Sequence, residues 1–266
     1  MSRLRSADAA QRVERSAGPD FSEALARGLH VITAFNAENR ALSLSDLARV
    51  VDLPRATVRR ALLTLVHLGF VSGDGRLYRL TPRVLRLATA YLTSNAVSTL
   101  LQPACDRIAQ QVGESCTAAV LEGADVVMIA RALPAQLVPA GVGVGFRLPA
   151  YCSALGRVLL SGLTSEALDA YLKATNLAIV TDHTMTDPAA IRRAVLAVAV
   201  NGFCYVDQEA EHGFRSVAVP LRRFDGTLVA ALNIGARIER ADADTMLVQH
   251  LPVLRAEAAM LSGCLV

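Results

Sequence analysis

Seven arginines lie within residues 54–86, accompanied by a single acidic residue, Asp74. Arginine carries a permanent charge and a planar set of N–H donors, which suits contact with phosphate groups and with the edge of guanine. Such a cluster is the electrostatic signature of a nucleic-acid-binding surface, although a solvated basic face has the same composition. The seven residues are Arg55, Arg59, Arg60, Arg76, Arg79, Arg83 and Arg86.

The charge is divided unevenly along the chain. Residues 1–98 contain 14 arginines and 8 acidic residues, whereas residues 99–266 contain 13 basic and 16 acidic residues. The overall net charge of +3 therefore hides a basic first part and an acidic second part. This asymmetry places the predicted nucleic-acid contacts in the first part of the chain.

Two short helices around a tight turn are predicted to carry the first arginines. One begins at Ser43 or Ser45 and reaches Val51; the other follows the turn at 52–54 and ends at Gly69. In helix-turn-helix geometry the second helix enters the major groove and presents its N-terminal side chains to base edges. The predicted DNA contacts are Ser45, Arg55, Ala56, Thr57, Arg59 and Arg60.

The segment that follows predicts a two-stranded wing. Asp74-Gly75 is a strong signal for a tight hairpin, and the residues that flank it alternate in polarity. We expect Arg76 and Arg79 on one face of this wing, in contact with the DNA backbone. The pattern predicts a winged helix-turn-helix domain over residues 21–81, after a flexible polar tail at 1–20.

The first helix of this domain is predicted to begin with Ser22 as its N-cap, because Leu25, Leu29, Ile32 and Phe35 follow at helical spacing.

The composition describes a globular chain with a sizeable core. Of 266 residues, 53% are apolar and 19% are charged, which excludes a disordered polymer. No apolar run approaches the roughly 18 residues that span a bilayer, and no apolar segment follows the charged N-terminus as in a secretory signal. Five cysteines without a C-x-x-C spacing argue against a disulfide framework or a zinc ribbon. We therefore expect a reduced, cytoplasmic protein without membrane association.

The second part of the chain alternates between helical and strand patterns, so the fold class is α+β. A helix over residues 82–98 is predicted to link it to the first domain, and residues 99–266 form the second domain. The predicted helices are 101–112, 153–162, 165–172, 188–201 and 241–261, and the predicted strands are 115–121, 126–130, 203–207, 216–221 and 229–236.

These segments, in this order, resemble the IclR family of bacterial transcription regulators. The resemblance covers residues 22–262, and within the family it is strongest to the branch that responds to protocatechuate or 4-hydroxybenzoate. The segments that carry it are 44–48, 53–62 and 68–71 for DNA binding, and Tyr151–Leu160 and Val206–Leu221 for effector binding.

The resemblance implies a GAF-like pocket on one face of the second domain's sheet, no cofactor, and a homodimer or dimer of dimers. A carboxylate effector needs an arginine or grouped N–H donors, such as those of the helix that opens at Ser153. Hydroxyl and amide side chains suit the ring hydroxyls. The predicted effector-binding residues are Arg131, Arg147, Tyr151, Cys152, Ser153, Ala154, Asp207, Arg215, Ser216 and Asn233.

Several of these residues have an equally simple structural interpretation. Arg147 fits a surface position, Asn233 fits a bond to neighbouring backbone, and Tyr151 fits plain packing. Glu209 and Glu211 are expected to serve in ion pairs or caps rather than as ligands.

Other function classes remain as alternatives to an aromatic-acid regulator. A regulator that senses an aliphatic acid such as glyoxylate has the same domains. His183 and His212 with Cys204 form a conceivable metal site, and Cys152 with Cys204 a conceivable thiol sensor. The chain lacks the G-x-S-x-G, H-E-x-x-H and Walker motifs of common enzymes. We therefore predict an effector-responsive regulator that binds double-stranded DNA, and not a catabolic enzyme.

Overall fold

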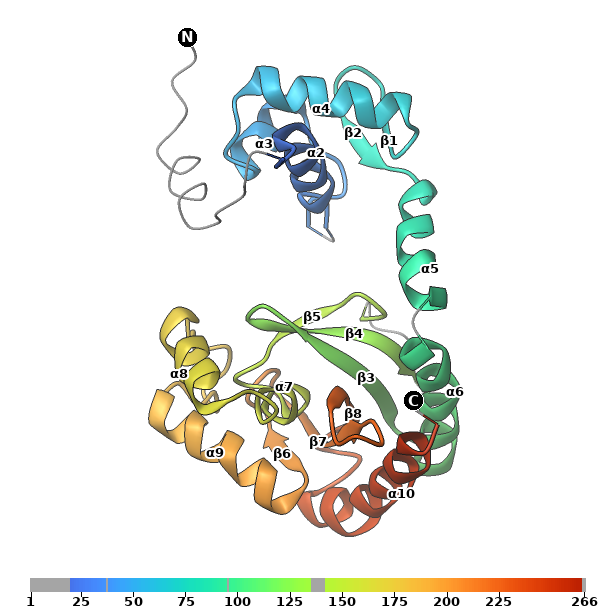
Figure 1. The fold of residues 1–266 in the computed structure, drawn as a ribbon, viewed down its shortest axis with the longest axis vertical. Helices are drawn as coiled ribbons and strands as arrows, with labels where there is room; N and C mark the ends of the chain where they lie inside the picture. Colours follow the sequence, from blue (N-terminus) through green and yellow to red (C-terminus); the bar gives the residue numbers. More distant parts are fainter. Residues whose placement is uncertain (1–19, 37, 95, 135–141, 265–266) are drawn as a thin grey trace. The chain divides into compact units, whose positions relative to one another are not determined.

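The computed structural model describes residues 20–36, 38–94, 96–134 and 142–264 (Figure 1). The chain divides into two compact units, Met1–Tyr91 and Leu92–Val266. The first unit is helical with a small hairpin, and the second is a mixed helix and sheet domain. The α+β fold class predicted from the sequence is confirmed.

In the described part of the first unit, the helices that precede the hairpin are α2 (Glu23–Thr33), α3 (Leu44–Val50) and α4 (Arg55–His67). The hydroxyl of Ser22 accepts a hydrogen bond from the backbone N–H of Leu25, and that of Ser43 accepts one from Asp46, so both helices begin at the capping residues that the sequence predicts. Leu25 itself is exposed. The buried side chains of this unit are Val31, Ala34, Phe35, Leu42, Leu47, Ala48, Val51, Leu53, Val58, Leu62, Leu65 and Val71.

A two-stranded hairpin completes the first unit. Strands β1 (Val71–Gly73) and β2 (Tyr78–Leu80) pair antiparallel. Leu42, which precedes α3, forms an isolated bridge with Tyr78 through two backbone hydrogen bonds of 3.1 and 2.9 Å. This bridge ties the hairpin to the start of the helix-turn-helix.

The described residues of the segment 82–98, where one linking helix is expected, are helical, but the α-helix begins three residues later than expected. Pro82 has no N–H and the Thr81 hydroxyl caps the N–H of Arg83, so a short 3-10 helix, Pro82–Val84, opens the segment. It is followed by α5 (Leu85–Ser94) and then by α6 (Ala96–Val112).

The second unit is built on one six-stranded antiparallel sheet in the order β5-β4-β3-β8-β7-β6. The predicted strands are present, and a short additional strand, β5, lies at one edge. The strands are β3 (Ser115–Glu122), β4 (Asp125–Ala132), β5 (Arg147–Pro149), β6 (Cys204–Asp207), β7 (Phe214–Arg222) and β8 (Leu228–Arg237).

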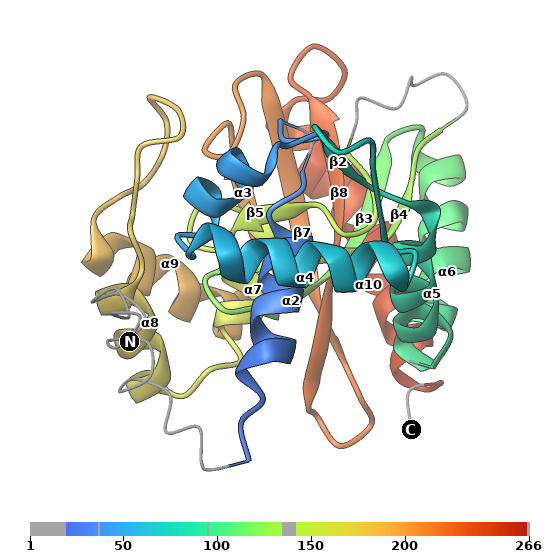
Figure 2. The same ribbon diagram turned by 90° about the horizontal axis from the view of Figure 1, so that it is seen from above.

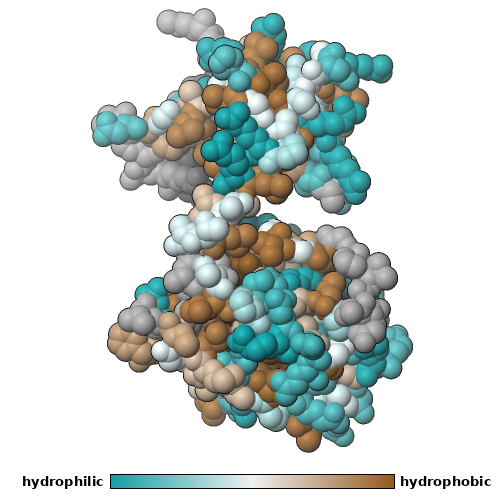
Figure 3. Space-filling view, turned by 90° about the vertical axis from the view of Figure 1, so that its right-hand side faces the viewer, coloured by the Kyte–Doolittle hydropathy of each residue, from teal (hydrophilic) through white to brown (hydrophobic). Residues whose placement is uncertain are grey.

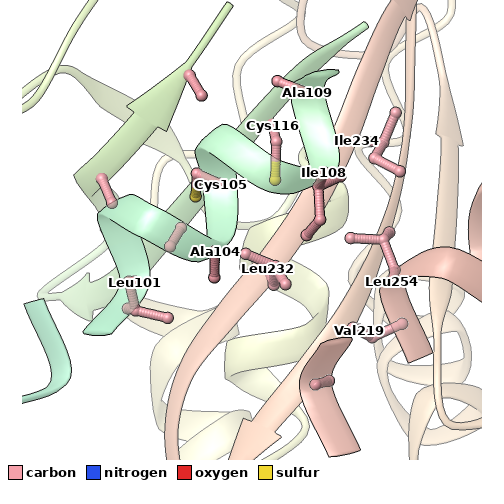
Figure 4. Close-up of a cluster of buried hydrophobic side chains, with 14 of the residues drawn as sticks. Leu101, Ala104, Cys105, Ile108, Ala109, Cys116, Val219, Leu232, Ile234 and Leu254 are labelled. Atoms are coloured by element: carbon pink, nitrogen blue, oxygen red, sulfur yellow. The ribbon is translucent and has the colours of Figure 1, made fainter. Parts of the chain in front are cut away.

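Helices cover both faces of this sheet, as Figures 1 and 2 show. One face packs against α6, a π-helix at Thr245–His250, and α10 (Leu251–Ser262); Figure 4 shows the side chains of α6 meeting Leu232 and Leu254 there. We call this the α10 face. The other face packs against α7 (Ala154–Leu160), α8 (Ser165–Ala174) and α9 (Pro188–Asn201), and we call it the α7 face.

The surface of both units mixes hydrophilic side chains with apolar patches (Figure 3). Exposed apolar residues include Leu85, Leu87 and Tyr91 of α5 and Met260 of α10. Among the described residues, no helix combines the length and the apolar character that a membrane span requires.

Candidate functional site

The helix-turn-helix consists of α3, α4 and the turn between them. Asp52 in this turn has a φ of 45°, a left-handed conformation that reverses the chain. Helix α4 turns Val58, Leu62 and Leu65 into the core. The predicted DNA contacts lie away from that core: Ser45, Arg55, Ala56, Arg59 and Arg60 are exposed, and Thr57 is half-buried.

The wing is held by its own turn. The Asp74 carboxylate accepts hydrogen bonds from the backbone N–H groups of Arg76 at 2.9 Å and Leu77 at 2.8 Å, and these bonds lower the pKa of that carboxyl. Arg79 lies on β2 opposite Ser72. Arg76 lies in the turn that precedes β2, and both arginines are exposed.

The arginines of α4 and the wing are not neutralised by acidic side chains in the part of the chain that the structure describes. Within the described ranges, none of Arg55, Arg59, Arg60, Arg76 and Arg79 forms an ion pair, whereas Arg49 of α3 pairs with Asp46 at 2.7 Å. Unpaired guanidinium groups on one helix and its wing are available for phosphate and base contacts.

In the second unit, polar side chains form a row across the α7 face of the sheet. Thr117 of β3 pairs with Arg131 of β4 on one side and with Asn233 of β8 on the other. The neighbours of Asn233 along its strand pack on the α10 face, so Asn233 points the other way. Ser216 of β7 lies on this same α7 face, two residues along the strand from Ala218, the residue that pairs with Asn233. Thr117, Ser216 and Asn233 are at most 8% exposed.

Two atoms of this row are buried without a hydrogen-bond partner. They are Nε of Arg131 and Oδ1 of Asn233. Burial lowers the pKa of the Arg131 guanidinium, and the negative charge of Glu211 acts in the opposite direction. Arg131 is half-buried and its Nη1 contacts Sδ of Met128 at 3.7 Å, so only its Nε is buried without a partner. A buried donor and a buried acceptor without partners are costly, and they suit a ligand that brings an anion and a donor.

The start of α7 lies against the sheet on the same face. The Ser153 hydroxyl accepts a hydrogen bond from the N–H of Gly156 at 3.1 Å, so the helix caps itself. A side chain at Gly156 would meet the carbonyl oxygen of Ala150 at 2.1 Å, so only glycine allows this close packing. The Tyr151 hydroxyl donates to the carbonyl of Ala178 at 2.6 Å, which agrees with a packing role. Cys152, Ser153 and Ala154 are all buried.

Arg147 lies at the edge of the sheet, on β5. Its guanidinium forms ion pairs with Glu122 and with Asp125, the latter at 3.1 Å, and its side chain is 46% exposed. The structure therefore gives Arg147 the surface position that the sequence left open, and it does not bring this residue to the row on the α7 face.

Asp207 and Arg215 lie on the opposite side of the sheet from Ser216. Arg215 donates from Nη1 to the carbonyl of Ala241 at 3.2 Å, and its Nε is 3.3 Å from Oδ1 of Asp207. Ala241 belongs to the cluster on the α10 face. Alternation along β7 explains the separation, because consecutive residues of a strand point to opposite faces.

The structure also shows where the residues of the thiol-sensor and metal-sensor alternatives lie. Cys152 and Cys204 are buried, and burial raises the pKa of each thiol to about 11, so the reactive thiolate is scarce. His183 and His212 do lie together, but the third neighbour is Asp182 rather than Cys204.

Sequence reasoning missed two residues of this domain. Thr117 carries no signal beyond its place in a strand, and the strand register alone reveals it. Arg157 forms a buried ion pair with Glu209, and a lone charge in the apolar segment 154–160 was the available signal. The expected ion-pair roles of Glu209 and Glu211 are confirmed, the latter with Arg237.

The chain matches two family models in the order in which its two units occur. The IclR helix-turn-helix domain matches residues 24–75, and the bacterial transcriptional regulator IclR C-terminal domain matches residues 89–263. Together the two models cover most of both units.

Several relatives and solved structures are similar over nearly the whole chain. The Pca regulon regulatory protein of Pseudomonas putida is 40% identical over 94% of this chain and 87% of its own length. The p-hydroxybenzoate hydroxylase transcriptional activator of Acinetobacter baylyi is 32% identical over 89% of each chain. A crystal structure of an IclR homolog complexed with 4-hydroxybenzoate, from Microbacterium hydrocarbonoxydans, is 29% identical with a TM-score of 0.75, and covers 90% of this chain and 98% of that one.

The fold, the exposed arginines of the helix-turn-helix and these similarities agree with each other. The chain belongs to the IclR family of bacterial transcriptional regulators, and it is a DNA-binding regulator rather than an enzyme.

Proposed function

We propose that this regulator responds to an aromatic hydroxy-acid, such as protocatechuate or 4-hydroxybenzoate, that binds on the α7 face of the sheet. The observation that carries the proposal is the row formed by Arg131, Thr117 and Asn233, in which a guanidinium nitrogen and an amide oxygen are buried without partners. A ligand that satisfies both atoms removes the cost of leaving them unpaired.

Each end of such a ligand has a partner in the row. The carboxylate pairs with Arg131 through a charge-assisted hydrogen bond. A ring hydroxyl donates to Oδ1 of Asn233, with Ser216 and Thr117 beside it on the same face. Two strand spacings, about 10 Å, separate the Cα atoms of Arg131 and Asn233. The relatives named for p-hydroxybenzoate hydroxylase and for bound 4-hydroxybenzoate support this class of effector.

The proposed site is narrower than the set predicted from the sequence. It retains Arg131, Ser216 and Asn233, and it adds Thr117. Ser153, Cys152 and Ala154 border it as buried residues at the start of α7. Arg147, Tyr151, Asp207 and Arg215 are left out because their polar groups pair elsewhere or lie on the other face.

For the DNA, we propose that α4 reads base edges and that the wing binds the backbone. Arg55, Thr57, Arg59 and Arg60, with Ala56 and with Ser45 of α3, face the major groove. Arg76 and Arg79 contact phosphates. Two copies bind two half-sites, as a homodimer or a dimer of dimers, with residues 82–98 linking the domains. The effector then changes DNA affinity by favouring one of two conformations.

Isothermal titration with four acids tests the effector proposal: 4-hydroxybenzoate, protocatechuate, benzoate and glyoxylate. We expect the hydroxybenzoates to bind, and Arg131→Gln to weaken them about 10- to 100-fold, since hydrogen bonds to charged groups contribute about 1.5–3 kcal/mol. Asn233→Ala reduces the preference for 4-hydroxybenzoate over benzoate. Arg147→Gln is the matched control and leaves binding unchanged.

Two results would count against this assignment. Equal losses of hydroxybenzoate affinity in Arg131→Gln and Arg147→Gln would show that the row on the α7 face is not the binding site. Binding of glyoxylate without binding of any aromatic acid would keep the regulator but give it an aliphatic effector, which is the second candidate.

A further inference from the structure

Two histidines and an aspartate from separate loops meet on the surface of the second unit. Oδ1 of Asp182 is 3.6 Å from Nε2 of His183 and 3.4 Å from Nδ1 of His212. One ligand atom from each residue lies within 4.8 Å of the other two. The two imidazole rings are 6.2 Å apart, edge to face.

The backbone that brings these loops together is firmly held. The Thr181 hydroxyl donates to the carbonyl of Gln208 at 2.7 Å, and the Thr184 hydroxyl donates to the carbonyl of Glu209 at 2.7 Å. Gln208 has a φ of 61°, a strained conformation for this residue, and its side chain accepts from the N–H of Gly213 at 3.0 Å. The position of His212 relative to Asp182 is therefore set by several independent contacts.

The geometry suits a tetrahedral metal ion. With zinc bonds of 2.0–2.2 Å to nitrogen and oxygen, neighbouring ligand atoms lie about 3.3–3.5 Å apart. The two distances from Asp182 are close to this value, and the ligand atoms of the two histidines lie within 4.8 Å of each other. Two imidazoles and one carboxylate form a mixed nitrogen and oxygen donor set, which favours Zn²⁺ over Mg²⁺ or Ca²⁺.

The surrounding charges also permit a cation. The Asp182 side chain is 77% exposed and carries a negative charge. Arg237 donates to the carbonyl of His212 at 3.2 Å, and Glu211 neutralises it with an ion pair at 2.6 Å. The cluster thus offers a carboxylate and two imidazoles without an unbalanced positive neighbour among the described residues.

We propose that Asp182, His183 and His212 bind one transition-metal ion of the zinc class, with a water molecule in the fourth position. The bound ion joins the 181–185 loop to the turn at 208–213. Glu209, the buried partner of Arg157 in α7, belongs to this turn, and it accepts hydrogen bonds from Thr184 and Met185 of the loop. The metal therefore stabilises the same loops that hold the ion pair beneath the sheet.

The test uses the full-length, tag-free protein after removal of metal with a chelator, with Cys264→Ser as the common background because that thiol is exposed. Calorimetry with Zn²⁺ is expected to give one ion per chain. His183→Gln and His212→Gln each weaken binding at least tenfold, whereas His67→Gln, an exposed histidine of the first unit, leaves it unchanged. Co²⁺ as a coloured probe gives a tetrahedral visible spectrum that both cluster variants lose.

Both histidines of the cluster are about half exposed or more, so the variants are expected to fold, and circular dichroism verifies this. The proposal is overturned if the parent chain binds no Zn²⁺ at 100-fold molar excess. It is equally overturned if His183→Gln and His212→Gln retain the affinity and the Co²⁺ spectrum of the parent.

Discussion

The guanidinium of Arg157 and the carboxylate of Glu209 form a two-pronged ion pair in the interior of the second unit. Nη1 donates to Oε1 at 2.7 Å and Nη2 donates to Oε2 at 2.6 Å, and the two side chains are 3% and 10% exposed. Arg157 also donates from Nε to the carbonyl of Tyr151, and Glu209 accepts from the N–H of Met185, both at 2.9 Å. The pair thereby connects α7, the 181–185 loop and the turn after β6.

Removing one member of this ion pair is expected to lower the free energy of unfolding severely. Glu209→Ala leaves the Arg157 charge buried and uncompensated, which costs about 3–5 kcal/mol of unfolding free energy. Urea denaturation of the purified protein measures this loss. The matched control is Asp169→Ala, which breaks an exposed pair with Arg192 and costs about 1 kcal/mol or less. Similar losses in both variants would contradict the burial argument.

Replacing an arginine of the wing is expected to lower the affinity for DNA regardless of the DNA sequence. Arg76→Ala removes one phosphate contact, so binding weakens for operator and scrambled DNA alike, and the slope of log K against log salt falls by about 0.9. Fluorescence anisotropy across a salt series measures both quantities. Arg193→Ala, an exposed arginine of α9, serves as the control. A loss confined to the operator would show that Arg76 reads bases instead.

A single methyl group added at Gly156 is expected to lower the stability of the protein. Gly156→Ala places a Cβ at 2.1 Å from the carbonyl oxygen of Ala150, so α7 must shift, and overpacking of this kind costs about 1–3 kcal/mol. Gly28→Ala in α2 meets nothing within 4 Å and gains up to about 1 kcal/mol from helix propensity. Thermal melts of the two variants are therefore expected to move in opposite directions.

His250 predicts a loss of stability in mild acid. Burial lowers the pKa of this imidazole below its ordinary value. As the pH falls, this imidazole takes up a proton in the unfolded chain before it does so in the folded one. The free energy of unfolding therefore decreases as the pH falls below about 6.5. Urea denaturation at pH 8 and pH 5.5 is expected to show a smaller acid loss in His250→Gln than in the parent. An unchanged difference between the two pH values would exclude this residue as a source.

The cysteines predict a selective reaction with thiol reagents. Cys264 is exposed, whereas Cys105, Cys116, Cys152 and Cys204 are buried. We expect a disulfide reagent to titrate one thiol rapidly in the native protein and all five after denaturation. Cys264→Ser should abolish the rapid phase. Rapid reaction of Cys152 or Cys204 would revive the thiol-sensor alternative.

Local signals in the sequence predicted most of the elements correctly. Ser22, Ser43 and Ser153 cap helices as expected, because capping depends on a few neighbouring residues. Asp74-Gly75 marks the wing turn for the same reason. The helix predicted over 82–98 begins three residues later, at Leu85, because Thr81 and Pro82 set up a 3-10 turn that an apolar stripe does not reveal.

The residues of the proposed effector site are harder to predict from the sequence because their arrangement depends on strand register. Ser216 and Arg215 are neighbours in the chain, yet they point to opposite faces of the sheet. Thr117 joins Arg131 and Asn233 only through pairing of strands that lie far apart in the sequence. Motif similarity identifies such a segment, whereas the face that each side chain occupies requires the three-dimensional structure.

The position of Arg147 on an edge strand affects the solubility of the protein rather than the binding of an effector. The strand that carries it has three residues and forms one open edge of the sheet, and β6 at the other edge has four. Long, flat and uncharged edges invite backbone pairing with a second chain and lead to aggregation. A short edge strand with a guanidinium held by two carboxylates discourages such pairing. The residue thus protects the sheet from association with other chains.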